Sequence, residues 1–272
     1  MPNTAGTNGQ APMFGVKRSY VSSPTVSVVV PMLDEQGGAQ PLIDEIAKNL
    51  AHLDFEIIVV DDCSRDGTAK ELETAAGRVP QLRVFRHAAS AGQSRAIRTG
   101  VIAARAPIIV TLDGDGQNDP SDIGGLIEIL RRDDAPPLLA MVAGERRIRR
   151  DAAAKKTASR IANAIRRRIL KDGAVDTGCG LKAFYRDAFL RLPYFDHCHR
   201  YLPALMRREG FEVEFQPVNH RPRAHGASKY TNFGRLRVAL ADLQGMVWLN
   251  SRARSPVEIS ALETGRGYDR VK

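Results

Sequence analysis

The stretch from Pro107 to Gln117 reads PIIVTLDGDGQ, an apolar run that ends in two carboxylates and an amide. The apolar half predicts a buried strand, and the acidic half lies where such a strand would reach the surface. In an extended segment alternate residues share one face, so Asp113, Asp115 and Gln117 are expected to converge on one ion. Oxygen ligands of this kind favour Mg²⁺ or Mn²⁺. An isolated Asp-x-Asp is also a common solvated turn, so the neighbouring segments decide between the two interpretations.

Three further apolar runs precede this one, at Thr25–Pro31, Phe55–Val60 and Leu82–Phe85. The first leads into the acidic loop 33–35, and the second leads into DDCSRD at 61–66. Apolar residues recur with helical spacing between the runs, which predicts connecting helices. The two clearest sets are Leu42, Ile43, Ile46 and Leu50, and Ile97, Val101 and Ile102.

Strands that alternate with helices predict an α/β domain with an open, mostly parallel sheet flanked by helices. In such sheets ligands bind beyond the carboxyl ends of the strands. The acidic clusters after three of the four runs all fall at those ends. The sequence therefore predicts one ligand site lined by carboxylates, and three unrelated turns are a poorer explanation.

Six motifs together resemble glycosyltransferase family 2, and within it the polyprenyl-phosphate sugar synthases of the dolichol-phosphate mannosyltransferase type. The resemblance spans about Val26 to Trp248, and the order and spacing of the motifs are more specific than any one of them. The motifs are VVVPMLDE at 28–35, IIVVDDCSRDGT at 57–68, AGQSRAIRTG at 91–100, TLDGDGQNDP at 111–120, DTGCGLKAF at 176–184 and HRPRAHGASKY at 220–230.

The resemblance implies the GT-A nucleotide-sugar-binding fold, a divalent cofactor (Mg²⁺ or Mn²⁺) and a role for each matched residue. The expected metal ligands are Asp113, Asp115 and Gln117. The expected catalytic residues are Asp115, Asp176 and Arg146. The residues expected to bind the acceptor phosphate are Arg223, Ser228, Lys229 and Arg146. Binding of the nucleotide sugar is expected from Pro31, Leu33, Glu35, Asp61, Asp62, Gly92 and Asp113.

Three positions depart from the family pattern without removing a carboxylate. Asp34 stands where the family usually has Asn, Cys63 where it usually has Gly, and Gly114 where Ala or Ser is common. Glycine at position 63 would allow backbone angles that cysteine tolerates poorly.

The composition fits one catalytic domain with appendages, because 272 residues with 43% apolar content can bury one sizeable core. We expect a disordered leader at 1–24, the GT-A domain at 25–232, an amphipathic membrane-surface helix at 233–252 and a disordered tail at 253–272. No run reaches the 18 or so apolar residues of a membrane span. The three cysteines lack paired C-x-x-C spacing, which indicates thiols in a reducing cytoplasm.

The positive charge is concentrated in one segment. Residues 146–171 contain eleven Lys and Arg against one acid, whereas the whole chain carries +9. An apolar stripe with helical spacing is expected there, and Arg166 is expected on the remaining, polar surface. The stripe consists of Ala154, Ala158, Ile161, Ile165 and Ile169. A basic amphipathic helix of this kind is typical of a membrane-surface element. A solvated helix on the core is the alternative; a nucleic-acid patch is disfavoured, because no aromatic residues are interleaved.

A second amphipathic helix is predicted at 233–248, with either a membrane or the protein core as its partner. Its apolar residues are expected on or near one face: Phe233, Leu236, Leu240, Leu243, Val247 and Trp248. Just before it, the sequence HRPRAHGASKY gathers cations and donors suited to a phosphate. The spacing of His197 and His199 also allows a metal pair, an interpretation that we disfavour.

The expected reaction is attack by a phosphate oxygen of polyprenyl phosphate on the anomeric carbon of a nucleoside-diphosphate sugar, with inversion, at the cytoplasmic face of the membrane. A phosphate monoester is largely dianionic at pH 7 and needs no general base. A hydroxyl acceptor would need one, and Asp176 is then the candidate; otherwise Asp176 orients the sugar or a basic side chain. A non-catalytic binding protein is a third alternative.

The sequence leaves the sugar open among mannose, glucose, a hexuronic acid and an amino-arabinose derivative, carried on GDP or UDP. Arg146, Lys182 and Arg186 together would suit a uronate. The oligomeric state also remains open.

Overall fold

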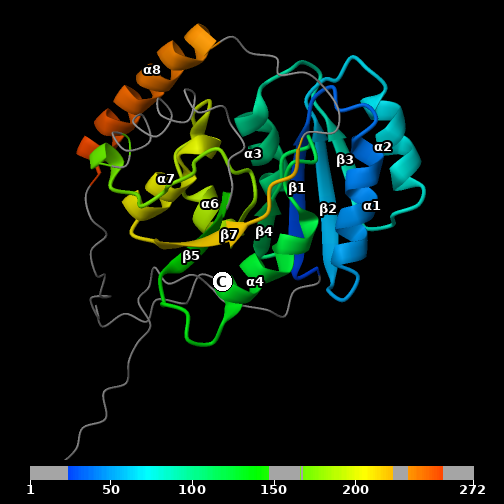
Figure 1. Cartoon of the computed structure of the whole chain (residues 1–272), viewed down its shortest axis with the longest axis horizontal. Helices are drawn as coiled ribbons and strands as arrows, with labels where there is room; N and C mark the ends of the chain where they lie inside the picture. The colour runs from blue at the N-terminus through cyan, green and yellow to red at the C-terminus, as the bar shows by residue number, and fades with distance from the viewer. Residues whose placement is uncertain (1–23, 147–165, 167, 223–231, 254–272) are drawn as a thin grey trace, which may run out of the picture.

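The computed structural model describes residues 24–146, 166, 168–222 and 232–253, which are built around a seven-stranded mixed sheet. The strand order is β3-β2-β1-β4-β6-β5-β7 (Figure 1). The strands are β1 (Val26–Met32), β2 (Phe55–Asp61), β3 (Leu82–Arg86), β4 (Ile108–Thr111), β5 (Leu139–Arg146), β6 (Lys182–Tyr185) and β7 (Glu212–Val218).

The four predicted strands are confirmed and form the parallel half of the sheet. β1 pairs in parallel with β2 and β4, and β2 pairs in parallel with β3. Every residue of β1 and β2 is buried, which explains their continuous apolar sequence. The α/β fold with a mostly parallel sheet is therefore as predicted.

The other half of the sheet contains an inverted strand that the sequence pattern did not predict. β6 is antiparallel to both of its neighbours, β4 and β5, while β7 is parallel to β5. The register pairs Lys182 with Thr111 and Tyr185 with Ile108. Lys182 therefore lies at the carboxyl end of β4, and the residue after Tyr185 lies at the opposite edge of the sheet.

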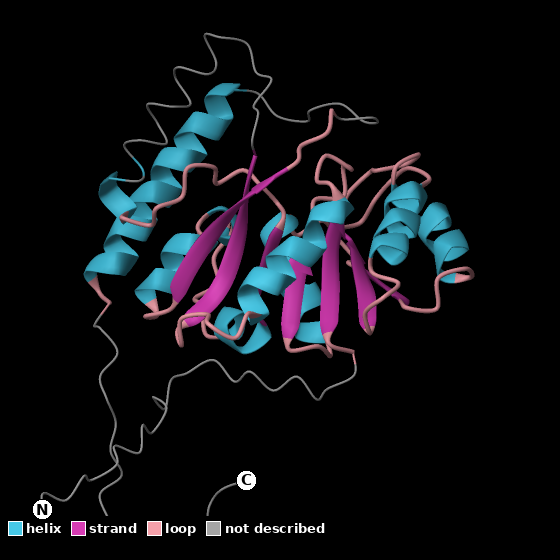
Figure 2. Cartoon of the chain, turned by 60° about the horizontal axis from the view of Figure 1, so that its bottom comes forward, coloured by secondary structure: helices cyan, strands magenta, loops and turns pink. Residues whose placement is uncertain are grey.

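Helices cover both faces of the sheet (Figure 2). They are α1 (Ala39–Asn49), α2 (Thr68–Ala76), α3 (Gln93–Ala103), α4 (Ile123–Arg131), α6 (Arg186–Leu190), α7 (Leu202–Arg208) and α8 (Asn232–Ser251), with short 3-10 helices at Pro120–Asp122 and Cys198–Arg200. α3 packs on β1 and β2, and α4 packs on β5 and β6.

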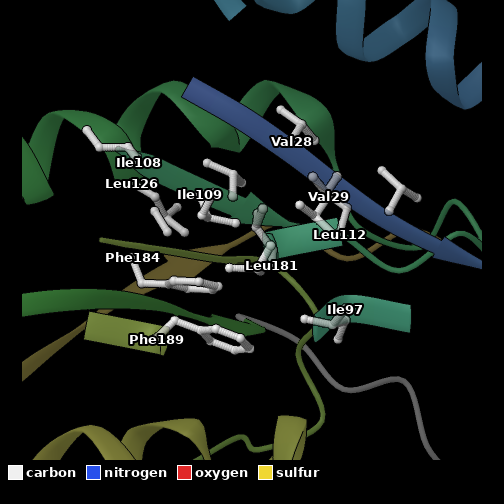
Figure 3. Close-up of a cluster of buried hydrophobic side chains, with 14 of the residues drawn as sticks. Val28, Val29, Ile97, Ile108, Ile109, Leu112, Leu126, Leu181, Phe184 and Phe189 are labelled. Atoms are coloured by element: carbon white, nitrogen blue, oxygen red, sulfur yellow. The ribbon is translucent and has the colours of Figure 1, made fainter. Parts of the chain in front are cut away.

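Buried side chains from β1, α3, β4, β6 and α6 meet in one continuous core (Figure 3). Phe184 of β6 stacks on Phe189 of α6 with ring centroids 5.1 Å apart. This packing holds β6 rigidly beside β4, and the loop that precedes β6 is thereby placed at the carboxyl end of β4.

α8 lies at the opposite end of the molecule from α1 and α2 (Figure 1). The apolar residues predicted for one face of this helix are only partly covered by the core. Leu243 and Met246 pack toward the core, whereas Leu240 is 54% exposed, Val247 46% and Trp248 62%. The side of the helix that contacts the core contains Leu243 and Met246 and not Leu240. Apolar side chains therefore also remain exposed on the outer side. Among the described helices, none is long and apolar enough to cross a membrane.

Most of the basic segment 146–171 lies outside the described residues, but its end contradicts the predicted polar face. Arg166 is buried and forms an ion pair with the fully buried Asp172. Ile169, expected in the apolar stripe, is 44% exposed. An unpaired charge is costly to bury, so the buried carboxylate of Asp172 is stabilised by a cationic partner. Arg166 is that partner, and its side chain therefore points into the protein.

Candidate active site

The acidic motif forms a turn and not an extended segment. β4 ends at Thr111, and the chain reverses through Gly116, whose φ is +71°. The alternating-face argument for Asp113, Asp115 and Gln117 is therefore wrong in its geometry. The two carboxylates of the turn are nevertheless near enough to interact. The negative charge of Asp115 contributes to a raised pKa of Asp113. The backbone N–H of Gln117 donates to Asp115 Oδ1 at 3.1 Å.

Asp113 is the centre of this group. Its Oδ1 accepts a hydrogen bond from Gln93 Nε2 at 2.7 Å, and its backbone N–H donates to Asn118 Oδ1 at 3.0 Å. Burial, followed by the negative charge of Asp115, raises the pKa of Asp113 to about 6. Gln93 and Asn118 were not predicted as site residues, although both lie within the quoted motifs. Only the position of these two residues within the family motifs could have marked them as site residues, because Gln and Asn are common at ordinary surface positions.

The loop before β6 closes over the acidic turn. A Cβ atom built on Gly180 would lie 2.3–2.4 Å from the three carboxylate atoms of Asp113. A Cβ built on Gly114 would lie 2.8 Å from the Pro31 carbonyl oxygen. At Gly114 the neighbouring atom belongs to the backbone, so the close approach requires glycine. At Gly180 the neighbouring atoms are the end of the Asp113 side chain, which would have to move to admit a larger residue. The departure from Ala or Ser at Gly114 lets the turn pack against the end of β1.

Arg146 at the end of β5 forms a two-pronged ion pair with Asp176. Arg146 Nη2 donates to Asp176 Oδ1 at 2.7 Å, and Arg146 Nε donates to Asp176 Oδ2. The Gly178 N–H also donates to Asp176 Oδ1, at 3.1 Å. Burial alone would lower the pKa of Arg146, but the bonds to Asp176 raise it. Of the two predicted roles for Asp176, orienting a basic side chain matches this geometry, and the side chain is Arg146.

Two other cations considered for the sugar site are separated by the fold. Lys182 is buried, and its ammonium donates to the Cys179 carbonyl close to Asp113. Arg186 instead donates to the carbonyls of Val101 and Ile102, at 3.0 Å each. Arg186 therefore caps the end of α3 at the opposite edge of the sheet. The prediction that Arg186 joins Arg146 and Lys182 in one cationic pocket is wrong.

The loop after β1 is joined to the loop after β2. Asp34 Oδ1 accepts from the Arg65 N–H at 2.7 Å, and the Glu35 N–H donates to Thr68 Oγ1 at 2.8 Å. Asp34 has φ +52° and Cys63 has φ +68°. Both departures from the family pattern thus occupy left-handed positions that Asn and Gly adopt more readily, as expected for position 63. Pro31 is buried in β1, and Leu33 and Glu35 lie half-buried just beyond it.

Asp61 and Asp62 are both buried and bind protein groups. Asp61 Oδ1 accepts from the Ser64 N–H at 2.9 Å. Asp62 accepts from the N–H groups of Ala91 and Gly92 at 2.8 Å each, and it also contacts Ser90 and His87. Burial would raise the pKa of Asp62, but these hydrogen bonds hold it below its ordinary value. Asp62 therefore positions Gly92, which begins α3 with φ +87°.

His197 and His199 turn to different partners. His199 Nδ1 lies 2.7 Å from Ser94 Oγ, and burial lowers the pKa of His199 well below its ordinary value. His197 Nδ1 lies 3.1 Å from Asp242 Oδ2 of α8. Among the described residues, no group of three or more His, Cys, Asp or Glu side chains could hold a metal ion.

The predicted acceptor loop begins beside the acidic turn. The Arg221 N–H donates to the Gln117 carbonyl at 2.9 Å, and Gln117 Nε2 lies 3.4 Å from the Arg221 carbonyl. The Arg221 side chain is held by Glu45 and Asp119. Arg223, Ser228 and Lys229 lie outside the described residues. The three cysteines are free thiols.

The residues at the turn fit a hard divalent cation. Asp113 and Asp115 place two carboxylates together in a partly buried site. Lys182 and Arg146 offset part of this negative charge, and a bound divalent cation would offset the rest. A cation bound there would neutralise charge on a leaving diphosphate.

Proton competition gives a first testable prediction. Because the pKa of Asp113 is about 6, Mn²⁺ affinity is expected to be constant above pH 7 and to fall up to tenfold per unit below pH 6. The sign is opposite for the metal-free protein: its Asp113 binds a proton more tightly when folded, so stability rises as pH falls from 6 toward 4. Mn²⁺ titration by electron paramagnetic resonance at pH 5, 6 and 7.5 measures the effect. An Asp113→Asn variant that retained the pH dependence would contradict the assignment.

Comparison with known proteins places the chain. Residues 27–192, more than half of its length, match the family model described as glycosyl transferase family 2. The chain belongs to glycosyl transferase family 2. It is 31% identical to a dodecaprenyl-phosphate galacturonate synthase of Rhizobium johnstonii, over 91% of this chain and 74% of that protein. It is 33% identical to an undecaprenyl-phosphate 4-deoxy-4-formamido-L-arabinose transferase of Sodalis glossinidius, over 76% of this chain and 63% of that protein.

The fold of this family 2 chain resembles that of solved glucosyl-3-phosphoglycerate synthase from Mycobacterium tuberculosis. The TM-score is 0.63 at 18% identity, covering 85% of this chain and 82% of that chain for the complex with UDP. Another structure of that protein contains Mn²⁺ and UDP-glucose. The likeness confirms the predicted GT-A fold. The site residues themselves remain predictions.

Proposed function

We propose that this family 2 glycosyltransferase transfers a sugar from a nucleoside-diphosphate sugar to polyprenyl phosphate, with inversion and with Mg²⁺ or Mn²⁺ bound by Asp113 and Asp115. The relatives named above are prenyl-phosphate sugar transferases, which supports this acceptor. The chain spans 63–74% of their length, so the activity of those whole proteins is carried over as a proposal.

The observation that supports this proposal most strongly is that Asp176 is already bound by other groups of the protein. Both of its oxygens contact Arg146, and one also accepts from Gly178 N–H. A carboxylate held in this way is a poor general base, because accepting a substrate proton would break a buried ion pair. A phosphate acceptor needs no base, and it would benefit from a cation fixed near the metal site. Arg146 is such a cation, because its positive charge is near enough to Asp113 to lower the pKa of that carboxyl.

In this mechanism the chain mainly positions charges. Asp113 and Asp115 hold the metal, which when bound stabilises the negative charge on the departing diphosphate. Gln93 and Gly180 hold Asp113 in place, and Asp62 fixes the start of α3. Arg146 orients the phosphate oxygen for attack. The segment 223–230 would complete the phosphate site, and attachment at the inner membrane face would bring the lipid within reach.

The Arg146–Asp176 pair provides a second prediction. Asp176→Asn and Arg146→Gln are each expected to lower kcat/KM for transfer to a short-chain polyprenyl phosphate about 100-fold. The double variant should be little worse than either single one, because both changes remove the same positioned cation. The pH profile of the residual Asp176→Asn activity should keep its shape.

A hydroxyl acceptor is the second candidate function and gives the opposite result. In that case Asp176→Asn would remove the general base, and the acid limb of the pH profile would disappear. The direct assay is a panel of GDP- and UDP-sugars, offered with Mg²⁺ or Mn²⁺ to short-chain polyprenyl phosphate and to simple sugar acceptors. Lipid-linked product from one donor would establish the reaction and name the sugar. Product only on a hydroxyl acceptor would refute the proposal.

A further inference from the structure

One buried hydroxyl joins the start of α3 to the short 3-10 helix Cys198–Arg200. Ser94, the second residue of α3, is 1% exposed, and its Oγ lies 2.7 Å from His199 Nδ1. The backbone N–H of His199 also donates to Ser94 Oγ, at 3.3 Å. Two groups of His199 thus converge on one side chain, although the two residues are 105 positions apart in the sequence.

His199 accepts the Ser94 hydroxyl proton as a neutral imidazole. Because Ser94 Oγ already accepts from a backbone N–H, its own hydrogen is free to be donated to Nδ1. Burial, followed by the positive charges of Arg200 and Lys182, holds the pKa of His199 well below its ordinary value. The imidazole is therefore neutral at pH 7, with its own proton on Nε2.

The first turn of α3 has few other means of being held in place. Helix ends fray unless capping groups bind them, and the N-cap residue Gly92 provides no side-chain cap. Asp62 binds the chain just before the helix, at the Gly92 N–H. On the other side, a Cβ built on Gly92 would lie 3.4 Å from Asp196 Oδ1, and the 3-10 helix packs against α3. The loop that contains His199 therefore supports this turn directly.

The same turn supplies a contact to the acidic site. Gln93 is the first residue of α3 and immediately precedes Ser94. Its Nε2 donates to Asp113 Oδ1 at 2.7 Å, and this hydrogen bond favours the charged form of the carboxyl group. If the turn moved, the Gln93 amide would move away from Asp113. The Ser94–His199 hydrogen bond thus lies one residue from a group that orients the carboxylate.

We propose that His199 is a positioning residue for the metal site. Through Ser94 it fixes the first turn of α3, so that Gln93 holds the Asp113 carboxylate in the orientation that binds the divalent cation. This inference rests on the proposed function, because that function requires the cation. In this arrangement His199 acts through two other side chains and is not itself a metal ligand.

The test is Mn²⁺ affinity of the full chain by electron paramagnetic resonance, which does not require sugar transfer. His199→Phe keeps a planar ring but offers Ser94 no acceptor, and it should lower the affinity about fivefold, the usual effect of losing one buried hydrogen bond. His199→Asn places an amide oxygen near the position of Nδ1 and should stay within about twofold of wild type. Ser94→Ala should match His199→Phe, and combining the two should add little.

The deciding comparison is made in a Gln93→Ala background. If His199 acts through Gln93, His199→Phe should change Mn²⁺ affinity less than about twofold there. The control is His197→Asn, which removes a contact with Asp242 of α8 from the same loop, at a φ of +62° that asparagine tolerates. This control should lower the melting temperature and keep the wild-type Mn²⁺ affinity.

The outcomes separate this inference from the proposed function. A fivefold loss that persists in the Gln93→Ala background, or equal losses in His199→Asn and His199→Phe, would show a general structural role and overturn this inference alone. So would an equal loss of Mn²⁺ affinity in the His197→Asn control. Absence of Mn²⁺ binding by wild type would overturn the metal-dependent function together with it.

Discussion

Asp115→Asn is expected to lower kcat/KM for sugar transfer about 1000-fold while leaving the fold intact. The substitution keeps the size of the side chain and removes one of the two negative charges that would hold the metal beside the diphosphate. Loss of one such electrostatic contact typically costs two to three orders of magnitude in rate. Mn²⁺ affinity should fall at least tenfold in the same variant.

A matched control for this variant is Asp133→Asn, which removes an exposed carboxylate between α4 and β5. Its transfer rate and metal affinity should equal those of wild type. The measurements are initial rates over a range of Mn²⁺ concentrations, and Mn²⁺ binding by electron paramagnetic resonance. If Asp115→Asn kept more than a tenth of the wild-type rate at saturating metal, Asp115 would not belong to the metal site.

Gly180→Ala is expected to lower kcat/KM about 100-fold through one added methyl group. The new Cβ would lie 2.3–2.4 Å from the carboxylate atoms of Asp113, and this contact is impossible without movement. The atoms that must move are the end of a side chain, so the carboxylate should rotate out of the metal site while the backbone stays in place. The melting temperature should change little, and metal affinity should fall with the rate.

Gly124→Ala is the control for this change, because nothing lies within 4 Å of the Cβ that it adds. Gly124 lies in α4, where alanine is the better helix former by roughly 1 kcal/mol. We expect full activity and a slightly higher melting temperature from this variant. Wild-type metal affinity in Gly180→Ala would show that the loop before β6 yields instead of Asp113, and the close packing would then have no role in the site.

Much of the parallel half of the sheet could be predicted because each strand carries a local signal. The runs that became β1, β2 and β4 are continuous and apolar since both faces of these strands are buried, and acidic loops follow them at one edge. β6 gave no comparable signal. Its antiparallel pairing depends on contacts with β4 and β5, which are far away along the chain.

Surface orientation was predicted less well than strand position. The polar face assigned to Arg166 from helical periodicity was wrong, and periodicity did not show that the core would cover only part of the apolar residues of α8. Periodicity gives the relative angles of side chains about a helix, but the rotation of the helix against its neighbours depends on partners such as Asp172. A buried acid supplied by another segment cannot be recognised within the helix itself.

Strand patterns and motif spacing are local properties of the chain, so the α/β class, the acidic edge of the sheet and the family could be predicted from them. Which charges act together depends on how the chain folds. In the folded protein Arg146 pairs with Asp176, Arg186 lies at the opposite edge of the sheet, and Gly180 packs against Asp113. The fold also brings His199 to Ser94. Such pairings depend on distances across the sheet of a few ångströms, and residue type and spacing do not specify these distances.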